Sequence, residues 1–342
     1  AKSAPTQSLR SEPNGKAMPS SLIASTLEQT IRHYGEDANA LTVAAKHHFS
    51  RPGKRTRAKL LFAASPLTKN SLALIHAAAA VELIHEASIV HDDIQDRTEY
   101  RRGNKTVWHK FGANTALLLG DHLVACAFKA IAEAPNVDSI RGALITTLSA
   151  AVSRAASGQH LQLTNHASGD FWSFYYDVAI NKTGALIALP LQLAVLLEGG
   201  QCASVTSAAQ CGEQLGLAYQ ILDDLKPYAT PDSLASHEDF VNGVITAPVA
   251  ACNELFSRKD PIQSLIDHAD RRALALRLCQ RWLNEALMHA RHSAALLPEH
   301  CAVVVEAFIK QQLTTAPATT RQTDNFKPWR ERQANSARVE AV

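Results

Sequence analysis

One short stretch decides how this chain folds and where its chemistry lies: residues 85–102 read HEASIVHDDIQDRTEYRR. An apolar segment, residues 72–90, leads directly into a group of acids that includes Asp92 and Asp96. These two are four residues apart, so on a helix they point the same way, about 6 Å apart along the axis. Mg²⁺ binds one or two protein carboxylates and completes its shell with waters and substrate phosphates. Arg101 and Arg102 follow, and guanidinium groups hold phosphates by paired hydrogen bonds.

A second acidic pair, Asp223 and Asp224, ends another apolar segment, residues 215–222. Two such helix ends that face each other would hold metal ions between them. Acids followed by bases are also typical of a solvated helix end, and this pattern alone leaves that interpretation open. The apolar segments that lead into both pairs favour acids at the mouth of a buried cavity.

The composition indicates a helical protein. The chain has 342 residues, of which 46% are hydrophobic, enough for a large core. Alanine- and leucine-rich segments recur at helical spacing, and no segment shows persistent alternation with a period of two. We therefore predict an all-α, single-domain helical bundle around a deep central cavity, over residues 21–313. The ends, residues 1–20 and 314–342, are predicted to be disordered tails because they are rich in small and polar residues.

Charge and cysteine content exclude several classes of protein. The formal net charge of +2 and the scattered basic residues argue against a nucleic-acid-binding protein. Six cysteines without a CxxC pair predict reduced thiols in a cytoplasmic protein. The longest apolar run, residues 185–197, contains Pro190 and Gln192 and is shorter than the roughly 20 residues of a membrane-spanning helix. We therefore predict no transmembrane segment.

Further short motifs surround the acidic stretch in a fixed order. They are GKRTR at 53–57, ELIH at 82–85, RRG at 101–103, FG at 111–112, GD at 120–121, GQHLQL at 158–163, KT at 182–183 and YQILDD at 219–224. With these motifs the chain resembles the trans-prenyl diphosphate synthases of the polyprenyl synthetase family over residues 25–312. The resemblance implies an isoprenoid synthase fold, a homodimer and a Mg²⁺-dependent transferase. Such an enzyme joins isopentenyl diphosphate head-to-tail to an allylic prenyl diphosphate.

The resemblance also implies a role for each matching residue. The residues predicted to hold isopentenyl diphosphate are Lys54, Arg57, His85 and Arg102, through positive charge and hydrogen-bond donors. Those predicted to bind Mg²⁺ on the allylic diphosphate are Asp92, Asp96 and Asp223, with Arg101 and Lys182 neutralising the remaining charge. Thr183 and Gln220 match positions that flank the carbocation. The predicted catalytic set is therefore Asp92, Asp96, Lys182, Thr183, Gln220 and Asp223.

Product length follows from the residues four and five positions before Asp92, which in this family line the floor of the chain-elongation pocket. Here they are Ser88 and Ala87, both small, so a product longer than farnesyl is predicted. Geranylgeranyl diphosphate is the first choice. A longer product stays open, because Phe128 or a residue on a facing helix could set the floor. Small residues in a helix also permit close helix packing, which is the alternative reading of this pair.

Several positions depart from the family pattern. Pro227 stands where a third aspartate is usual, Val244 replaces a lysine, and Gln159 replaces a glutamate; the loop of residues 229–238 also lacks a lysine. Three functions remain: a chain-elongating prenyltransferase, a class I terpene cyclase or prenyltransferase with another acceptor, and a noncatalytic subunit of a heteromeric prenyl synthase. The complete isopentenyl cluster favours the first, since a cyclase has no use for a second diphosphate site.

Overall fold

The computed structural model describes residues 20–65, 71–164, 170–229, 231–256 and 260–313. The predicted tails lie outside these residues, except that residue 20 begins the first helix.

The first helices are α1 (Ser20–Glu36), α2 (Thr42–Phe49), α3 (Thr56–Ala64), α4 (Ser71–Gln95), α5 (Val107–Phe111), α6 (Ala113–Ala132) and α7 (Arg141–Thr164). They are followed by α8 (Phe171–Ala179), α9 (Ala185–Leu197), α10 (Cys202–Leu225), α11 (Glu238–Val241), α12 (Ala247–Phe256), α13 (Pro261–Asp267), α14 (Ala269–Ala294) and α15 (Glu299–Gln312). Short non-α turns are η2 (Asn39–Leu41), η3 (Ile180–Gly184), η4 (Lys226–Ala229) and η5 (Pro231–Ser236).

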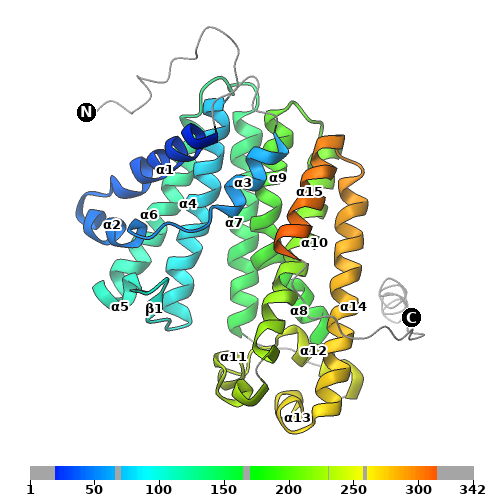
Figure 1. Ribbon diagram of the computed structural model, residues 1–342. Helices are drawn as coiled ribbons and strands as arrows, with labels where there is room; N and C mark the ends of the chain where they lie inside the picture. The colour runs from blue at the N-terminus through cyan, green and yellow to red at the C-terminus, as the bar shows by residue number, and fades with distance from the viewer. Residues whose placement is uncertain (1–19, 66–70, 165–169, 230, 257–259, 314–342) are drawn as a thin grey trace, which may run out of the picture.

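The predicted all-α bundle is confirmed. The long helices run side by side, with α1 and α2 on one flank and α14 and α15 on the other (Figure 1). Helix α4 packs along α6, and α10 packs along both α9 and α14. Four consecutive alanines of α4, residues 77–80, are fully buried, and their small side chains let neighbouring helices approach closely. The six cysteines are free thiols, as the composition predicted.

Length and composition would allow three of the described helices to cross a membrane, which corrects the prediction that no stretch is long enough. They are Leu72–Gln95, Ala113–Ala132 and Phe171–Leu197. In the first and third of these helices, 89% and 61% of the most apolar 18-residue stretch is buried inside the bundle. Core packing therefore accounts for the apolar composition of these two helices. In the second, helix α6, only 44% is buried, and an apolar face remains on the surface.

The turn η3 joins α8 to α9 as a single turn of π-helix, which is rare and frequent at functional sites. Two glycines from neighbouring helices hold it. A Cβ atom on Gly158 of α7 would lie 2.3 Å from the backbone nitrogen of Lys182, and one on Gly216 of α10 would lie 2.3 Å from the Cα of Gly184. Only glycine permits backbones to approach so closely. Helices α7 and α10 therefore fix the turn that carries Lys182 and Thr183.

The two short strands, β1 (Tyr100–Arg101) and β2 (Asn104–Lys105), form an antiparallel hairpin after α4. Its two turn residues, Arg102 and Gly103, have φ angles of +53° and +76°. Positive φ at both central residues is the type I′ geometry that suits the twist of a two-residue hairpin. We call residues 100–105 the arginine hairpin, because it presents Arg101 and Arg102.

Candidate active site

Both acidic motifs lie at helix ends, as the sequence predicted. Asp92 is in the last turn of α4, and the backbone N–H of Asp96 donates to the carbonyl oxygen of Asp92 at 2.8 Å, so the two acids are one turn apart. Asp223 lies in the last turn of α10. That helix gives way to η4 just before Pro227, which cannot continue the backbone hydrogen bonding.

Three cavities meet at Lys182 and Thr183, which line all of them. A cationic cavity of about 670 Å³ includes Lys54, Arg57, His85, Arg102 and Gln220. An acidic cavity of about 580 Å³ includes Asp96, Asp223, Asp224, Lys226, His237, Asp239 and Val244. An apolar cavity of about 550 Å³ includes Ile84, Ala87, Ser88, Val124, Val152 and Leu186. The turn η3 thus stands where three chemically distinct hollows join.

The cationic cavity brings together all four residues predicted to hold isopentenyl diphosphate. Burial lowers the pKa of His85 far below its usual value, and the nearby Arg57 and Arg102 charges add to this effect. His85 is therefore neutral near pH 7, so within this cluster it serves as a hydrogen-bonding group, and the positive charge comes from Lys54, Arg57 and Arg102. The Nε of Arg57 is buried and finds no acceptor among the described residues. A buried donor of this kind is expected to meet a ligand.

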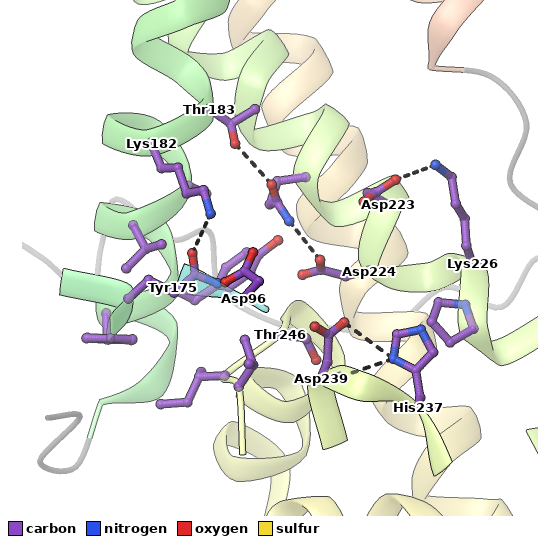
Figure 2. A pocket seen from close by; sticks show the side chains of 18 residues that line it. Asp96, Tyr175, Lys182, Thr183, Asp223, Asp224, Lys226, His237, Asp239 and Thr246 are labelled. Atoms are coloured by element: carbon purple, nitrogen blue, oxygen red, sulfur yellow. Dashed lines mark hydrogen bonds and ion pairs between the residues drawn. The ribbon is translucent and has the colours of Figure 1, made fainter. Parts of the chain in front are cut away.

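The acidic cavity gathers carboxylates from three parts of the chain (Figure 2). Burial raises the pKa of Asp239, and the nearby Asp223 and Asp96 carboxylates add to the rise, whereas His237 opposes it. Asp223 pairs with the ammonium of Lys226, which lies three residues further along. The cavity therefore combines mutually repelling carboxylates with a few cations at its edge.

Lys182 lies between the acidic and cationic cavities. Its Nζ donates to Oε1 of Gln162 at 2.9 Å and lies 3.8 Å from Oδ2 of Asp92. Burial raises the pKa of Asp92, and the charge of Lys182 opposes this rise while Asp96 adds to it. Lys182 is thus held in place by α7 and α4 before any substrate arrives.

A hydrogen-bond relay orients Thr183. Oδ2 of Asp224 accepts from the backbone N–H of Ala247, and its Oδ1 accepts from Nε2 of Gln220, each at 2.9 Å. This fixes the Gln220 amide so that its Oε1 accepts from the Thr183 hydroxyl at 3.0 Å (Figure 2). With its proton donated to Gln220, the hydroxyl keeps its lone pairs for the cavity. Burial raises the pKa of Asp224 to about 7.

The predicted metal ligands suit a hard divalent cation by their chemistry. Asp92, Asp96 and Asp223 offer only carboxylate oxygens. Asp96 helps to raise the pKa of Asp92, and both Asp96 and Asp223 help to raise the pKa of Asp239, a repulsion that a cation would relieve. They do not form a ready-made cage: within the described residues, no three His, Cys, Asp or Glu side chains come together closely enough to hold a metal ion. Mg²⁺ needs no such cage when substrate phosphates complete its shell. The residues therefore fit a metal that arrives with a diphosphate.

A sequence profile of the polyprenyl synthetases matches residues 38–279. The chain belongs to this family. Among polyprenyl synthetases, it is 32% identical over 210 residues to the geranylgeranyl pyrophosphate synthase of Geoglobus acetivorans, a match that covers 60% of this chain and 64% of that protein. It is 28% identical over 227 residues to the decaprenyl-diphosphate synthase of Dictyostelium discoideum, covering 65% of this chain and 48% of that protein. The matches thus span less than two thirds of both relatives.

The fold agrees with solved structures of polyprenyl synthetases. The geranylgeranyl pyrophosphate synthetase from Pyrococcus horikoshii Ot3 superposes with a TM-score of 0.74 at 25% identity, over 86% of this chain and 98% of that one. The isoprenoid synthase fold predicted from the sequence is therefore confirmed. A polyprenyl synthase from Caulobacter crescentus CB15, which superposes with a TM-score of 0.70 at 24% identity over 86% of this chain and 95% of that one, was solved in complex with calcium and isoprenyl diphosphate.

Sequence reasoning missed several residues of the site. Asp224 was singled out only as part of an acidic pair that could hold metal ions, whereas its carboxylate accepts from Gln220 and from the backbone of Ala247. Gln162, three residues after Gln159 in the GQHLQL motif, is the hydrogen-bond partner of Lys182. Asp239 lies outside every motif that was singled out, and only the folded chain brings it to Asp96 and Asp223.

Proposed function

We propose that this protein is a trans-prenyl diphosphate synthase that condenses isopentenyl diphosphate with an allylic diphosphate. The junction of three cavities at Lys182 and Thr183 supports this assignment. Head-to-tail condensation needs a cationic place for one diphosphate, a metal-binding place for the other and an apolar channel for the growing chain. All three must open onto the atoms that react, and here they share η3.

In this proposal the allylic diphosphate lies between the two acidic helix ends. Asp92, Asp96 and Asp223 would hold the Mg²⁺, whose chemistry is to neutralise the departing diphosphate and so lower the barrier to carbon–oxygen cleavage. Lys182 and Arg101 add fixed positive charge beside the same group. Isopentenyl diphosphate binds in the cationic cavity to Lys54, Arg57, His85 and Arg102.

The carbocation left by ionisation faces Thr183 and Gln220. Because the relay from Asp224 fixes both side chains, the Thr183 oxygen lone pairs stabilise positive charge without having to reorient. The isopentenyl double bond then attacks the cation, and the released diphosphate takes up the proton that is lost. Carbon–carbon bond formation and proton loss together give the elongated allylic diphosphate.

We propose a product of geranylgeranyl length or longer. Ala87 is buried and Ser88 turns its hydroxyl onto the backbone of its own helix, donating to the His85 carbonyl oxygen at 2.8 Å. Both line the apolar cavity, so no bulky or polar group closes it there. The lining continues to Val124 of α6, and Phe128 lies one turn further along this helix, half-buried against the core. We place the floor of the channel at Phe128.

The test is a product assay with purified protein, Mg²⁺, isopentenyl diphosphate and, separately, dimethylallyl, geranyl and farnesyl diphosphates. The proposal predicts a prenyl diphosphate product of geranylgeranyl length or longer. This product should disappear in the Asp92→Ala variant, which loses a metal ligand. Asp138→Ala is the matched control, since Asp138 lies in the α6–α7 connection, is 88% exposed, pairs with Arg141 and lines none of the three cavities. Failure of the wild-type protein to elongate any primer would refute the assignment.

A noncatalytic subunit of a heteromeric prenyl synthase is the second candidate. It is favoured by the pairing of Asp223 with Lys226, which occupies one predicted metal ligand with an internal cation. In that case the purified chain alone would be inactive with every primer and would gain activity only with a partner subunit. A terpene cyclase would instead convert an allylic diphosphate alone into a hydrocarbon, which the same assay would detect.

We also propose a homodimer formed through helix α6. Leu117 and Leu118 of this helix are 51% and 54% exposed, and Leu163 at the end of α7 is 52% exposed. Apolar side chains gathered on helix faces are typical of subunit interfaces. Leu118→Glu is expected to give a monomer in sedimentation experiments. The control is Val303→Glu, an apolar position on α15 that is 65% exposed, which should leave the assembly unchanged.

A further inference from the structure

Helix α4 carries three more buried carboxylates outside the predicted metal-binding and diphosphate-binding residues, Glu82, Glu86 and Asp93. Two of these, Glu86 and Asp93, contact the arginine hairpin. They are seven residues, two helical turns, apart and so share one face of the helix. Their exposed fractions are only 1% and 4%. Carboxylates this deeply buried remain charged only when cations or donors surround them.

Each of the two carboxylates contacts one arginine of the arginine hairpin. Oδ1 of Asp93 accepts from Nε of Arg101 at 2.7 Å and lies 2.7 Å from Nη2 of the same guanidinium. Oε1 of Glu86 lies 3.8 Å from Nη1 of Arg102. The guanidinium of Arg102 also donates to the carbonyl oxygen of Arg51 at 3.1 Å. The hairpin therefore rests on α4 through its two functional side chains.

His48 of α2 contacts Glu86 and lies on the same small cavity as Asp93. Its Nε2 lies 2.8 Å from Oε2 of Glu86, and its side chain is only 9% exposed. Both arginines of the hairpin line this cavity too. The remaining partner of Glu86 is Arg55, whose Nη1 donates to Oε1 at 2.6 Å. Together these contacts hold the pKa of Glu86 well below its usual range despite its burial.

We infer that His48, Glu86 and Asp93 form a clasp that fixes the arginine hairpin, so that Arg101 and Arg102 are positioned for the two diphosphates before either binds. His48 is a positioning residue in this arrangement, since it touches no substrate and acts through Glu86, which it contacts. The inference rests on the proposed function only in naming diphosphates as the ligands.

The clasp explains why two adjacent arginines on a short hairpin can serve two different ligands. A long side chain that is free in the unbound protein loses roughly 0.5–1.5 kcal/mol of rotamer freedom when a ligand immobilises it. Each arginine held beforehand avoids that loss, which at the middle of the range corresponds to about fivefold in affinity, or about 30-fold for the two together. Loss of the clasp should therefore weaken diphosphate binding without changing the groups that make the contacts.

The first test is calorimetric binding of inorganic pyrophosphate to the full chain without metal, where only the cationic residues can hold it. His48→Ala is expected to raise the dissociation constant about tenfold, and His48→Gln, which keeps a side-chain hydrogen-bonding group, should recover part of the loss. His47→Ala is the matched control. Its ring Nε2 contacts the carbonyl oxygen of Lys105 at 2.8 Å on the same hairpin, but within the part of the chain that the structure describes it contacts neither Glu86 nor Asp93.

The second test is independent of any ligand. Amide hydrogen exchange in residues 100–105 should quicken markedly in His48→Ala and much less in His47→Ala, which loses a single contact with the hairpin at Lys105. If His48→Ala binds pyrophosphate as tightly as the wild type, or if both alanine variants weaken binding and loosen the hairpin equally, the clasp is refuted. If the wild type itself fails to bind pyrophosphate while exchange at the hairpin still depends on His48, the proposed diphosphate chemistry is at fault and the clasp stands.

Discussion

Replacement of Gly158 by alanine should damage catalysis through the backbone of the π-turn. A Cβ atom at this position would lie 2.3 Å from the backbone nitrogen of Lys182, whereas ordinary contact begins near 3.4 Å. The turn or helix α7 must therefore move by the difference, 3.4 − 2.3 = 1.1 Å. A misplacement of about 1 Å can reduce turnover on the order of 100-fold. Overpacking should also lower the free energy of unfolding by about 1–3 kcal/mol.

The measurement combines steady-state turnover with urea unfolding of the purified variant. Gly142→Ala is the matched control, because Gly142 lies on the same helix and no atom lies within 4 Å of the position where its Cβ would stand. Its helix propensity should improve by roughly 0.5–1 kcal/mol, with turnover unchanged. A folded Gly158→Ala protein whose turnover stays within about threefold of wild type would refute the claim that close backbone packing positions Lys182 and Thr183.

Three further predictions concern single side chains of the site. Thr183→Val should lower turnover on the order of 100-fold while pyrophosphate affinity stays within about twofold, since it removes only the oriented hydroxyl; equal losses in turnover and affinity would contradict this. Phe128→Ala should shift the product distribution toward longer chains in chromatography, and an unchanged distribution would move the floor elsewhere. Lys226→Met should tighten Mn²⁺ binding, followed by electron paramagnetic resonance, by about two- to fivefold. The effect is small because the exposed ion pair between Lys226 and Asp223, which competes with the metal for the Asp223 carboxylate, is worth only ~0.2–1 kcal/mol. Weaker Mn²⁺ binding in the variant would show that Lys226 does not compete with the metal for Asp223.

The fold class was predictable because helical spacing of apolar residues is a local signal that runs through the whole chain. The one-turn separation of Asp92 and Asp96 was predictable for the same reason, since it depends only on helix geometry. The convergence of Lys54, Arg57, His85 and Arg102 was not visible in spacing, and it came from the resemblance to a family.

Other features depend on tertiary contacts that no local pattern encodes. The π-turn at residues 180–184 has no sequence signature, because glycines on other helices impose it. The neutral state of His85 follows from burial and from neighbouring arginines, which the motif alone does not reveal. Asp239 joins the acidic cavity only because the chain returns after η5, so its charge could not be assigned from the sequence.

The type I′ turn of the arginine hairpin places an arginine where backbone preference opposes it. Arg102 has a φ of +53°, a conformation that costs a residue with a Cβ roughly 1–2 kcal/mol. Glycine or asparagine adopts this backbone conformation at lower cost. A selection for thermostable variants would therefore favour replacement of Arg102 by one of these residues, and the guanidinium group would be lost. Stability and ligand recognition therefore compete at this one residue, and changes that stabilise the hairpin there are expected to come at the expense of diphosphate binding.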